Sequence, residues 1–99
     1  MKTVWKYSLP IEDCSELRMQ KGAQILCVGF QGIPDLGVAT AIQIWARVDT
    51  DAIQEKRKFR VYGTGHPMPD YPGEYIGTVQ LAHGALVFHV FDDSEAQRY

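Results

Sequence analysis

The chain has 99 residues, 45% of them hydrophobic and 22% charged, and a formal net charge of −2. A chain of this length folds as one domain and buries roughly two-thirds of its unfolded surface, and its composition excludes an intrinsically disordered protein. Because the net charge disfavours binding to nucleic acid or to an anionic membrane, any anion site must come from local clustering of basic residues.

The first predicted strand covers residues 4–9. Trp5, Tyr7 and Leu9 alternate with polar residues and therefore share one face of this strand. Pro10 ends the run because proline cannot donate to a sheet ladder.

Three further segments before residue 50 have strand character. Residues 14–19 are a weaker candidate, and residues 23–30, AQILCVGF, are a nearly continuous apolar run that predicts a strand covered on both faces. Residues 31–37 contain the glycines and proline of a loop. Residues 38–49 alternate and are rich in β-branched side chains, which favours a strand over a helix. The inward residues of this strand are predicted to be Ile42, Ile44, Ala46 and Val48.

The C-terminal half contains three more strand candidates. Residues 58–64 place Phe59 and Val61 inward and Arg60 and Tyr62 outward. Two more candidates, 74–82 and 85–91, flank a tight turn at His83 and Gly84. In the first of these, one side is predicted to carry Tyr75, Val79 and Leu81.

Six or seven short strands without a long amphipathic helix predict an all-β fold, either a small antiparallel β-sandwich or a partly open barrel. The expected organisation is a single β domain over residues 1–92, followed by a charged tail at residues 93–99. The predicted core consists of Phe59, Val61, Val79, Leu81, Phe88 and Val90.

Segments along most of residues 4–92 carry a family resemblance. The segments are WKYSL, KGAQIL, WARVD, FRVYGTGHPMP, YIGTVQL and GALVFHVF, of which GTGHP-x-P and LVFHVF are the most specific. Together they resemble a family of small proteins encoded by tailed bacteriophages and prophages. The resemblance implies a bacteriophage origin and transfers no activity. GIPDLGVATAIQ is longer than the family's hairpin connection, which leaves the strand register between Phe30 and Trp45 undetermined.

The loop that follows Tyr62 is the predicted ligand site. Glycines at two alternate positions can present successive N–H groups as a nest for an anion. Four of the ten basic residues lie just upstream, at positions 56–60, and tyrosine rings offer a surface on which a base could stack. The predicted ligand-binding residues are Arg60, Tyr62, Gly63, Thr64, Gly65 and His66. The alternative is that the glycines and prolines only shape a strand connection, since the pattern matches neither the dinucleotide fingerprint nor the P-loop.

The closing strand predicts an oligomer. ALVFHVF contains one polar residue, His89, so the strand is either central in a barrel or covered on one face by another subunit. Trp45 lies on the polar phase of its own strand, which a subunit contact would explain. The expected assembly is a homo-oligomer, a dimer or larger, with an interface formed by Trp45, Val87, His89 and Phe91.

Metal and catalytic chemistry are not indicated. The three histidines, His66, His83 and His89, have no cysteine at a zinc-ligand spacing, so no metal and no cofactor are predicted. There is no G-x-S-x-G motif, and no catalytic residue is assigned. Asp70 and Glu74 near His66 are the one candidate acid–base cluster.

Two compartment signals are absent. No apolar run reaches the about 20 residues of a membrane span, and MKTVWKYSLP lacks the apolar stretch of a signal peptide. The sequence therefore predicts a protein of the bacterial cytoplasm. Cys14 and Cys27 are expected to be reduced there, with Cys27 in the core; a disulfide or a redox site is the alternative.

The leading functional hypothesis is a non-catalytic bacteriophage accessory protein, active in the cytoplasm of the infected host. It would bind and sequester a small anionic, nucleotide-like immune signal of that host. One alternative is a module that binds and inhibits a host protein, and the other is a small enzyme.

Overall fold

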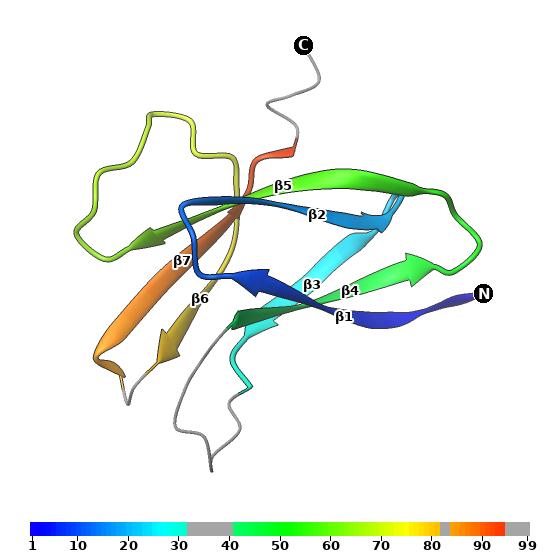
Figure 1. Ribbon diagram of the computed structural model, residues 1–99, viewed down its shortest axis with the longest axis horizontal. Coiled ribbons are helices and arrows are strands. Elements are labelled where there is room, and N and C mark those ends of the chain that lie inside the picture. Colours follow the sequence, from blue (N-terminus) through cyan, green and yellow to red (C-terminus); the bar gives the residue numbers. More distant parts are fainter. Residues whose placement is uncertain (32–40, 82–83, 95–99) are drawn as a thin grey trace.

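A computed structural model describes residues 1–31, 41–81 and 84–94 of the chain. Within these ranges the fold consists of antiparallel strands in two sheets, which we call sheet A, with the order β1-β4-β3, and sheet B, with the order β2-β5-β7-β6 (Figure 1). The strands are β1 (Lys2–Pro10), β2 (Cys14–Gln20), β3 (Gln24–Gly29), β4 (Ala41–Asp49), β5 (Gln54–Gly63), β6 (Glu74–Leu81) and β7 (Leu86–Asp92). The all-β prediction is confirmed, and the sheets are not closed into a barrel.

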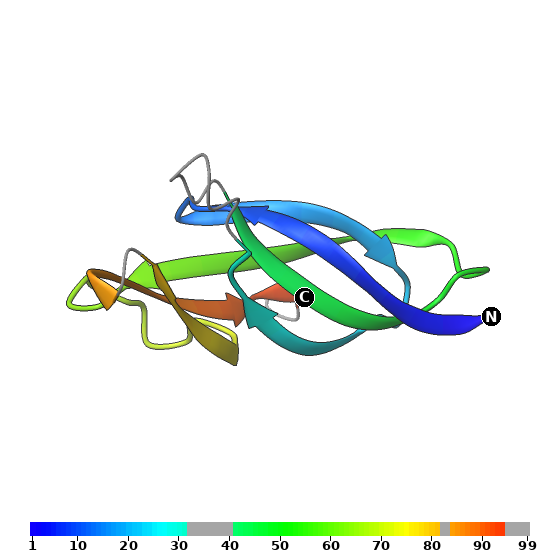
Figure 2. The ribbon, with the colours of Figure 1, turned by 90° about the horizontal axis from the view of Figure 1, so that it is seen from below.

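The core lies between the two sheets. The molecule measures 38 × 36 × 16 Å, and Figure 2 shows it edge-on, with its shortest dimension vertical. The predicted alternation in β4 is confirmed, since Ile42, Ile44, Ala46 and Val48 are all buried. The register that the sequence left open is defined for the described part of this region, where Ile42 pairs with Leu9 and Ile44 pairs with Val28.

Sheet B supplies the other half of the core. Five of the six predicted core residues are buried: Phe59, Val61, Val79, Leu81 and Val90. Phe88 is only partly buried and packs against the edge of the core. It lies near the start of β7, where Leu86, on the same face, is already exposed.

Two β-bulges explain why the predicted orientations of Cys27 and Tyr75 were wrong. One lies between Ile25 and Cys27 and one between Tyr75 and Gly77. An extra residue in a strand reverses the side to which the following residues point. Cys27 is therefore exposed instead of buried in the core, and Tyr75 faces away from its predicted neighbours Val79 and Leu81.

The apolar strand β3 is also not covered on both faces as predicted. It is an edge strand of sheet A, and Leu26 in its bulge is exposed. Both cysteines are free and exposed.

Sheet A and sheet B approach most closely where β3 lies against β6. A Cβ atom built on Gly77 would lie 2.6 Å from Cγ2 of Val28. A side chain at this position would have to displace Val28, so glycine allows the two edge strands to approach this closely.

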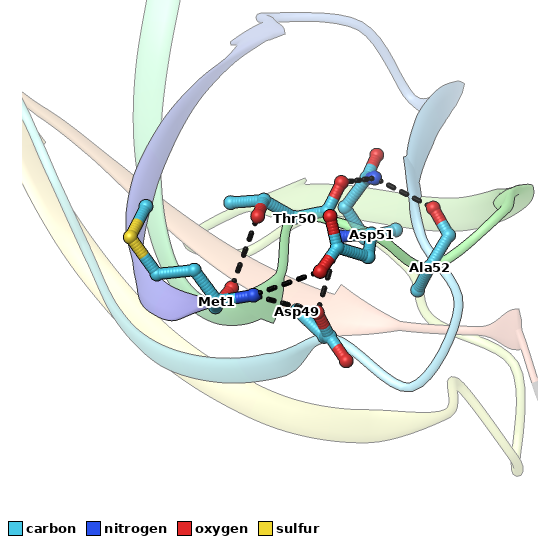
Figure 3. A network of polar contacts seen from close by, with 6 residues as sticks. Met1, Asp49, Thr50, Asp51 and Ala52 are labelled. Carbon is cyan, nitrogen blue, oxygen red and sulfur yellow. Dashed lines mark hydrogen bonds and ion pairs between the residues drawn. The ribbon is translucent and has the colours of Figure 1, made fainter.

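A turn at residues 50–53 connects β4 of sheet A with β5 of sheet B. The Met1 ammonium group lies 3.0 Å from Oδ2 of Asp51 and 3.4 Å from Oδ1 of Asp49 (Figure 3). The backbone amide of Asp51 also donates to Asp49 (3.1 Å). That hydrogen bond, together with the Met1 charge, lowers the pKa of the Asp49 carboxyl. These contacts hold the start of β1 beside the turn.

The residues after β7 continue along β5. The Asp93 amide donates to the Lys58 carbonyl (2.9 Å), and Ser94 Oγ accepts from the Lys58 amide (2.9 Å). Asp93 and Ser94, which the sequence placed in a charged tail, thus pack on sheet B; residues 95–99 lie outside the described part of the chain. Among the described residues, no helix has the length and hydropathy to cross a bilayer.

Candidate functional site

Arg60, the central residue of the predicted ligand site, is held in an ion pair. It lies on the outer face of sheet B, as its phase predicts, and its Nε donates to Oδ2 of Asp93 over 2.7 Å. The Asp93 side chain is almost fully buried, whereas that of Arg60 is about one-third exposed, 34%. The hydrogen bond to Asp93 is the main cause that raises the pKa of Arg60. The guanidinium group is therefore directed to the chain's own carboxylate.

Two backbone N–H groups of the predicted anion nest are hydrogen-bonded within the protein itself. The Thr64 amide donates to the Val87 carbonyl (3.2 Å), and the His66 amide donates to the Gly63 carbonyl (3.0 Å). Only Gly65 of the two glycines has a positive φ, 87°. The His66 ring folds over Gly63, where an added Cβ would meet ring atoms at 3.0 Å. Two amide donors and the space above the first glycine are thus used internally.

The loop after residue 63 is a broad excursion at the end of the molecule opposite the β4–β5 turn (Figure 1). Residues 64–71 are all exposed, and Tyr71 is 90% exposed. Three of the predicted ligand-binding residues, Thr64, Gly65 and His66, therefore lie at exposed positions in this loop.

The outer face of sheet B carries a row of aromatic side chains instead. The Tyr62 and Phe91 rings meet edge to face with centroids 5.7 Å apart, and the Tyr75 and Phe91 rings do so at 5.5 Å. These residues come from β5, β7 and β6, which are adjacent in the sheet. Tyr75 is 57% exposed. We call Tyr62, Phe91 and Tyr75 the aromatic row.

A chain of polar side chains runs beside the aromatic row. Thr64 Oγ1 lies 2.8 Å from Nε2 of His89, and Nδ1 of His89 lies 3.0 Å from Oγ1 of Thr78. Thr78 Oγ1 in turn lies 2.6 Å from the Tyr75 hydroxyl. Since a hydroxyl can donate or accept, either tautomer of His89 is satisfied. These bonds fix the side chains in position, which lowers the entropy that they lose on binding a partner.

The predicted interface residues separate onto opposite faces. Val87, His89 and Phe91 lie on the outer face of sheet B and are partly exposed. Trp45 lies on the outer face of sheet A, where it pairs with Lys6 and Cys27. A single self-complementary contact between two copies therefore cannot use all four residues.

Basic residues continue the outer face of sheet B beyond the aromatic row. Lys56, Lys58 and Arg60 share the outward phase of β5, and Arg18 of β2 lies opposite Lys56. Asp93 lies 3.9 Å from Lys58 as well as next to Arg60. Because Lys56 and Arg18 are both exposed, this side of the face is locally positive on a chain with negative net charge.

A second site, which the sequence reasoning missed, lies between the two bulges. A pocket of about 130 Å³ opens between β3 and β6, with the ion pair of Arg57 and Asp92 at its wall. Arg57 Nη2 lies 2.5 Å from Asp92 Oδ2, and Nη1 donates to the Ala23 carbonyl (2.9 Å). The residues that line the pocket are Ile25, Leu26, Arg57, Glu74, Tyr75, Ile76 and Asp92.

The sequence did contain a signal for this pair. Arg57 shares the inward phase of Phe59, and Asp92 shares the inward phase of Val90. A charged residue at an inward position requires a buried partner, and the two side chains supply this partner to each other. None of the six predicted ligand-binding residues lines this pocket.

The described residues contain no group of three or more histidine, cysteine or acidic side chains that could hold a metal ion; His83 lies outside them. The predicted acid–base cluster is exposed at all three of its positions, namely Asp70, Glu74 and His66. Nothing in the described part of the chain points to catalysis.

The comparison with known proteins gives one family. No curated protein and no solved structure matches this chain. The family described as Domain of unknown function (DUF7352) matches residues 1–99. The chain therefore belongs to the DUF7352 family.

Proposed function

We propose that the protein is a non-catalytic interaction protein that binds another protein through the outer face of sheet B. The observation that carries this proposal is the aromatic row across β5, β7 and β6, with Tyr75 more than half exposed. Aromatic residues are enriched in the cores of protein interfaces, where they account for much of the binding free energy. A sheet face is also nearly flat, whereas a small molecule needs a concave site that covers most of its surface.

The charge around the aromatic row indicates the kind of partner. Exposed Lys56 and Arg18 lie on the same face as the aromatic row. Complementary charge at the rim of an interface steers encounter and selects partners. The proposed partner is therefore a protein with an apolar contact surface next to acidic side chains.

The resemblance to bacteriophage and prophage proteins supports the setting of this proposal. In that setting the partner would be a host protein, and we place this protein in the cytoplasm of the infected bacterium.

The basic residues beside the aromatic row support a second candidate, which is binding of a small anionic, nucleotide-like molecule on the same face. Stacking of a base on Tyr75 with its phosphate near Lys56 would use both features. Titration calorimetry with a panel of nucleotides, at low and high salt, tests this candidate. Binding that weakens with salt and is lost in Lys56→Ala would favour the small molecule over the protein partner.

Replacing Tyr75 with alanine is expected to weaken partner binding at least tenfold, because truncation of a central aromatic side chain commonly costs 2 kcal/mol or more. Tyr71→Ala is the matched control, since Tyr71 is a more exposed tyrosine that lies in the loop outside the aromatic row. The measurement is the affinity of both variants for a protein captured from host lysate by the wild type. Equal loss in both variants, or loss in Tyr71→Ala alone, would contradict the use of this face.

Arg60→Ala is expected to lower the free energy of unfolding by about 1–2 kcal/mol, because it removes a charge-assisted hydrogen bond from the buried Asp93 carboxylate. The value is at the low end for a charged partner since Arg60 is one-third exposed and Lys58 remains 3.9 Å from Asp93. Urea denaturation measures the change. An unaltered midpoint would show that Arg60 is free for the ligand role predicted from the sequence.

A further inference from the structure

Within the described residues, the two sheets have four edge strands, and three of them carry features that protect against pairing with another chain. Strand β1 has lysines at positions 2 and 6 and ends at Pro10, and strands β3 and β6 contain bulges and lie against each other. Charged residues, proline and bulges are the usual means by which edge strands avoid pairing. Strand β2 has neither bulge nor proline, and its register with β5 is unbroken from Cys14 to Gln20. Its charged residues, Glu16 and Arg18, have opposite signs, so unlike the lysines of β1 they can complement a second copy of the strand.

Hydrogen bonds at the two ends of β2 show which of its backbone groups are free. The Val61 amide donates to the Asp13 carbonyl (3.2 Å), and the Lys21 amide donates to the Ile53 carbonyl (2.7 Å). In an antiparallel pair, hydrogen bonding alternates along each strand. Odd-numbered residues of β2 therefore direct their N–H and C=O groups to β5, and even-numbered residues direct theirs to the free edge. Glu16 and Arg18 thus present backbone donors and acceptors at this edge.

The same two residues carry opposite charges on exposed side chains. If a second copy of β2 pairs antiparallel at the free edge, hydrogen bonding requires even-numbered residues to lie opposite even-numbered ones. A two-fold axis at Glu16 would place the two Glu16 side chains opposite each other, and an axis at Arg18 would do the same for arginine. An axis at Leu17 places Glu16 of each copy opposite Arg18 of the other copy, which gives two oppositely charged pairs. Opposite charges at directly paired positions stabilise a sheet, and like charges destabilise it.

We propose that the protein forms a dimer in which the β2 strands of two copies pair antiparallel about an axis at Leu17. Each Glu16–Arg18 pair exchanges two backbone hydrogen bonds. The two Leu17 residues form the closer, non-hydrogen-bonded pair, with Cα atoms about 4.5 Å apart, on the side of the sheet that faces the core. The Gln20 side chain is already bound by the carbonyls of Thr50 and Ala52, so the contact centres on residues 16–18.

This dimer differs from the interface predicted from the sequence, which used Trp45 and β7. Its axis is perpendicular to sheet B, so the two sheets join into one and both aromatic rows face the same side. The dimer would therefore offer two binding faces to one surface, which raises avidity without any new contact. Formation of the dimer does not depend on the proposed protein partner.

Charge reversal tests the dimer by sedimentation over a range of concentrations. The wild type is expected to dimerise, and Glu16→Arg and Arg18→Glu are each expected to raise the dissociation constant by roughly tenfold to a hundredfold, because two paired positions become like-charged. The double variant Glu16→Arg/Arg18→Glu is expected to dimerise as the wild type does. An equimolar mixture of the two single variants is expected to form heterodimers, since every pair is then complementary.

The matched control is Asp70→Arg, which makes the same change of charge at an exposed loop position and is expected to leave dimerisation unchanged. Circular dichroism melts establish that each variant is folded. A wild type that stays monomeric, single variants that dimerise as the wild type does, or a mixture that stays monomeric while each component is folded would overturn the proposal.

Discussion

Replacing Asp92 with alanine is expected to lower the free energy of unfolding by about 3–5 kcal/mol, because it leaves the Arg57 guanidinium buried without its ionic partner. The side chains of the pair are only 13% and 10% exposed. Asp92 also accepts a hydrogen bond from the Ser94 amide (2.9 Å), so the substitution also removes one of the contacts that hold the residues after β7 in place. Urea denaturation of the wild type and the variant measures the loss.

Asp51→Ala is the matched control for this prediction. Asp51 also takes part in an ion pair, with the Met1 ammonium group at 3.0 Å, but its side chain is 84% exposed. Exposed ion pairs contribute about 0–1 kcal/mol, so the control is expected to be nearly neutral. Similar losses in both variants would show that burial of the Arg57–Asp92 pair is not what makes it important.

The same pair predicts a dependence of stability on pH. Burial alone raises the pKa of Asp92, but hydrogen bonds from Ser94 and Arg57 and the charge of Arg57 together lower it below its usual value. A carboxyl whose pKa is lowered by folding contributes stability above the pKa of the unfolded chain, about 4. That contribution is lost as the pH falls through the lower pKa of the folded state.

Urea denaturation of the wild type and Asp92→Asn over a pH series measures this contribution. The advantage of the wild type over the variant is expected to be full at neutral pH and to shrink below about pH 4. A difference that stays constant down to strongly acidic pH would contradict the direction of the Asp92 shift.

Phe59→Ala is expected to lower the free energy of unfolding by about 3–5 kcal/mol, because it removes a fully buried aromatic side chain from the middle of the core. Phe88→Ala is the matched control: the same substitution on the same sheet, at a residue that is only partly buried. The sequence predicted Phe88 as a core residue as well, but because it is only partly buried, the expected loss for Phe88→Ala is about 1–2 kcal/mol. Equal losses in denaturant melts would show that the two positions are equally part of the core.

Local pattern in the sequence was sufficient to place all seven strands, although β5 begins at Gln54, four residues before the start predicted at residue 58. The alternation at residues 42–48 and 58–62 reports directly which side chains face inward, because successive side chains of a strand point to opposite faces. The same alternation predicted that Arg60 points outward, and this holds. Each of these predictions depends only on residues that are neighbours in the chain.

The predictions that were wrong depend on contacts between distant strands. The bulges beside Cys27 and Tyr75 arise from the pairing of β3 with β4 and of β6 with β7, and one extra residue reversed the side that each pattern implied. The sequence also could not show that Asp93 would lie beside Arg60, 33 residues away. The Asp93 carboxylate thus pairs with the Arg60 guanidinium that the sequence analysis assigned to an anionic ligand.

The candidate surfaces of the protein were decided by tertiary structure for the same reason. Tyr62, Phe91 and Tyr75 form one row only because β7 lies between β5 and β6, an order that the sequence of strands along the chain does not contain. The assignment of strands to the two sheets also determines that β2 has a free edge in sheet B. It places Trp45 on the outer face of sheet A, on the other side of the molecule from the aromatic row. Alternation within a strand is a local property and can be read from the sequence, whereas strand order is set by the joint packing of both sheets around one core.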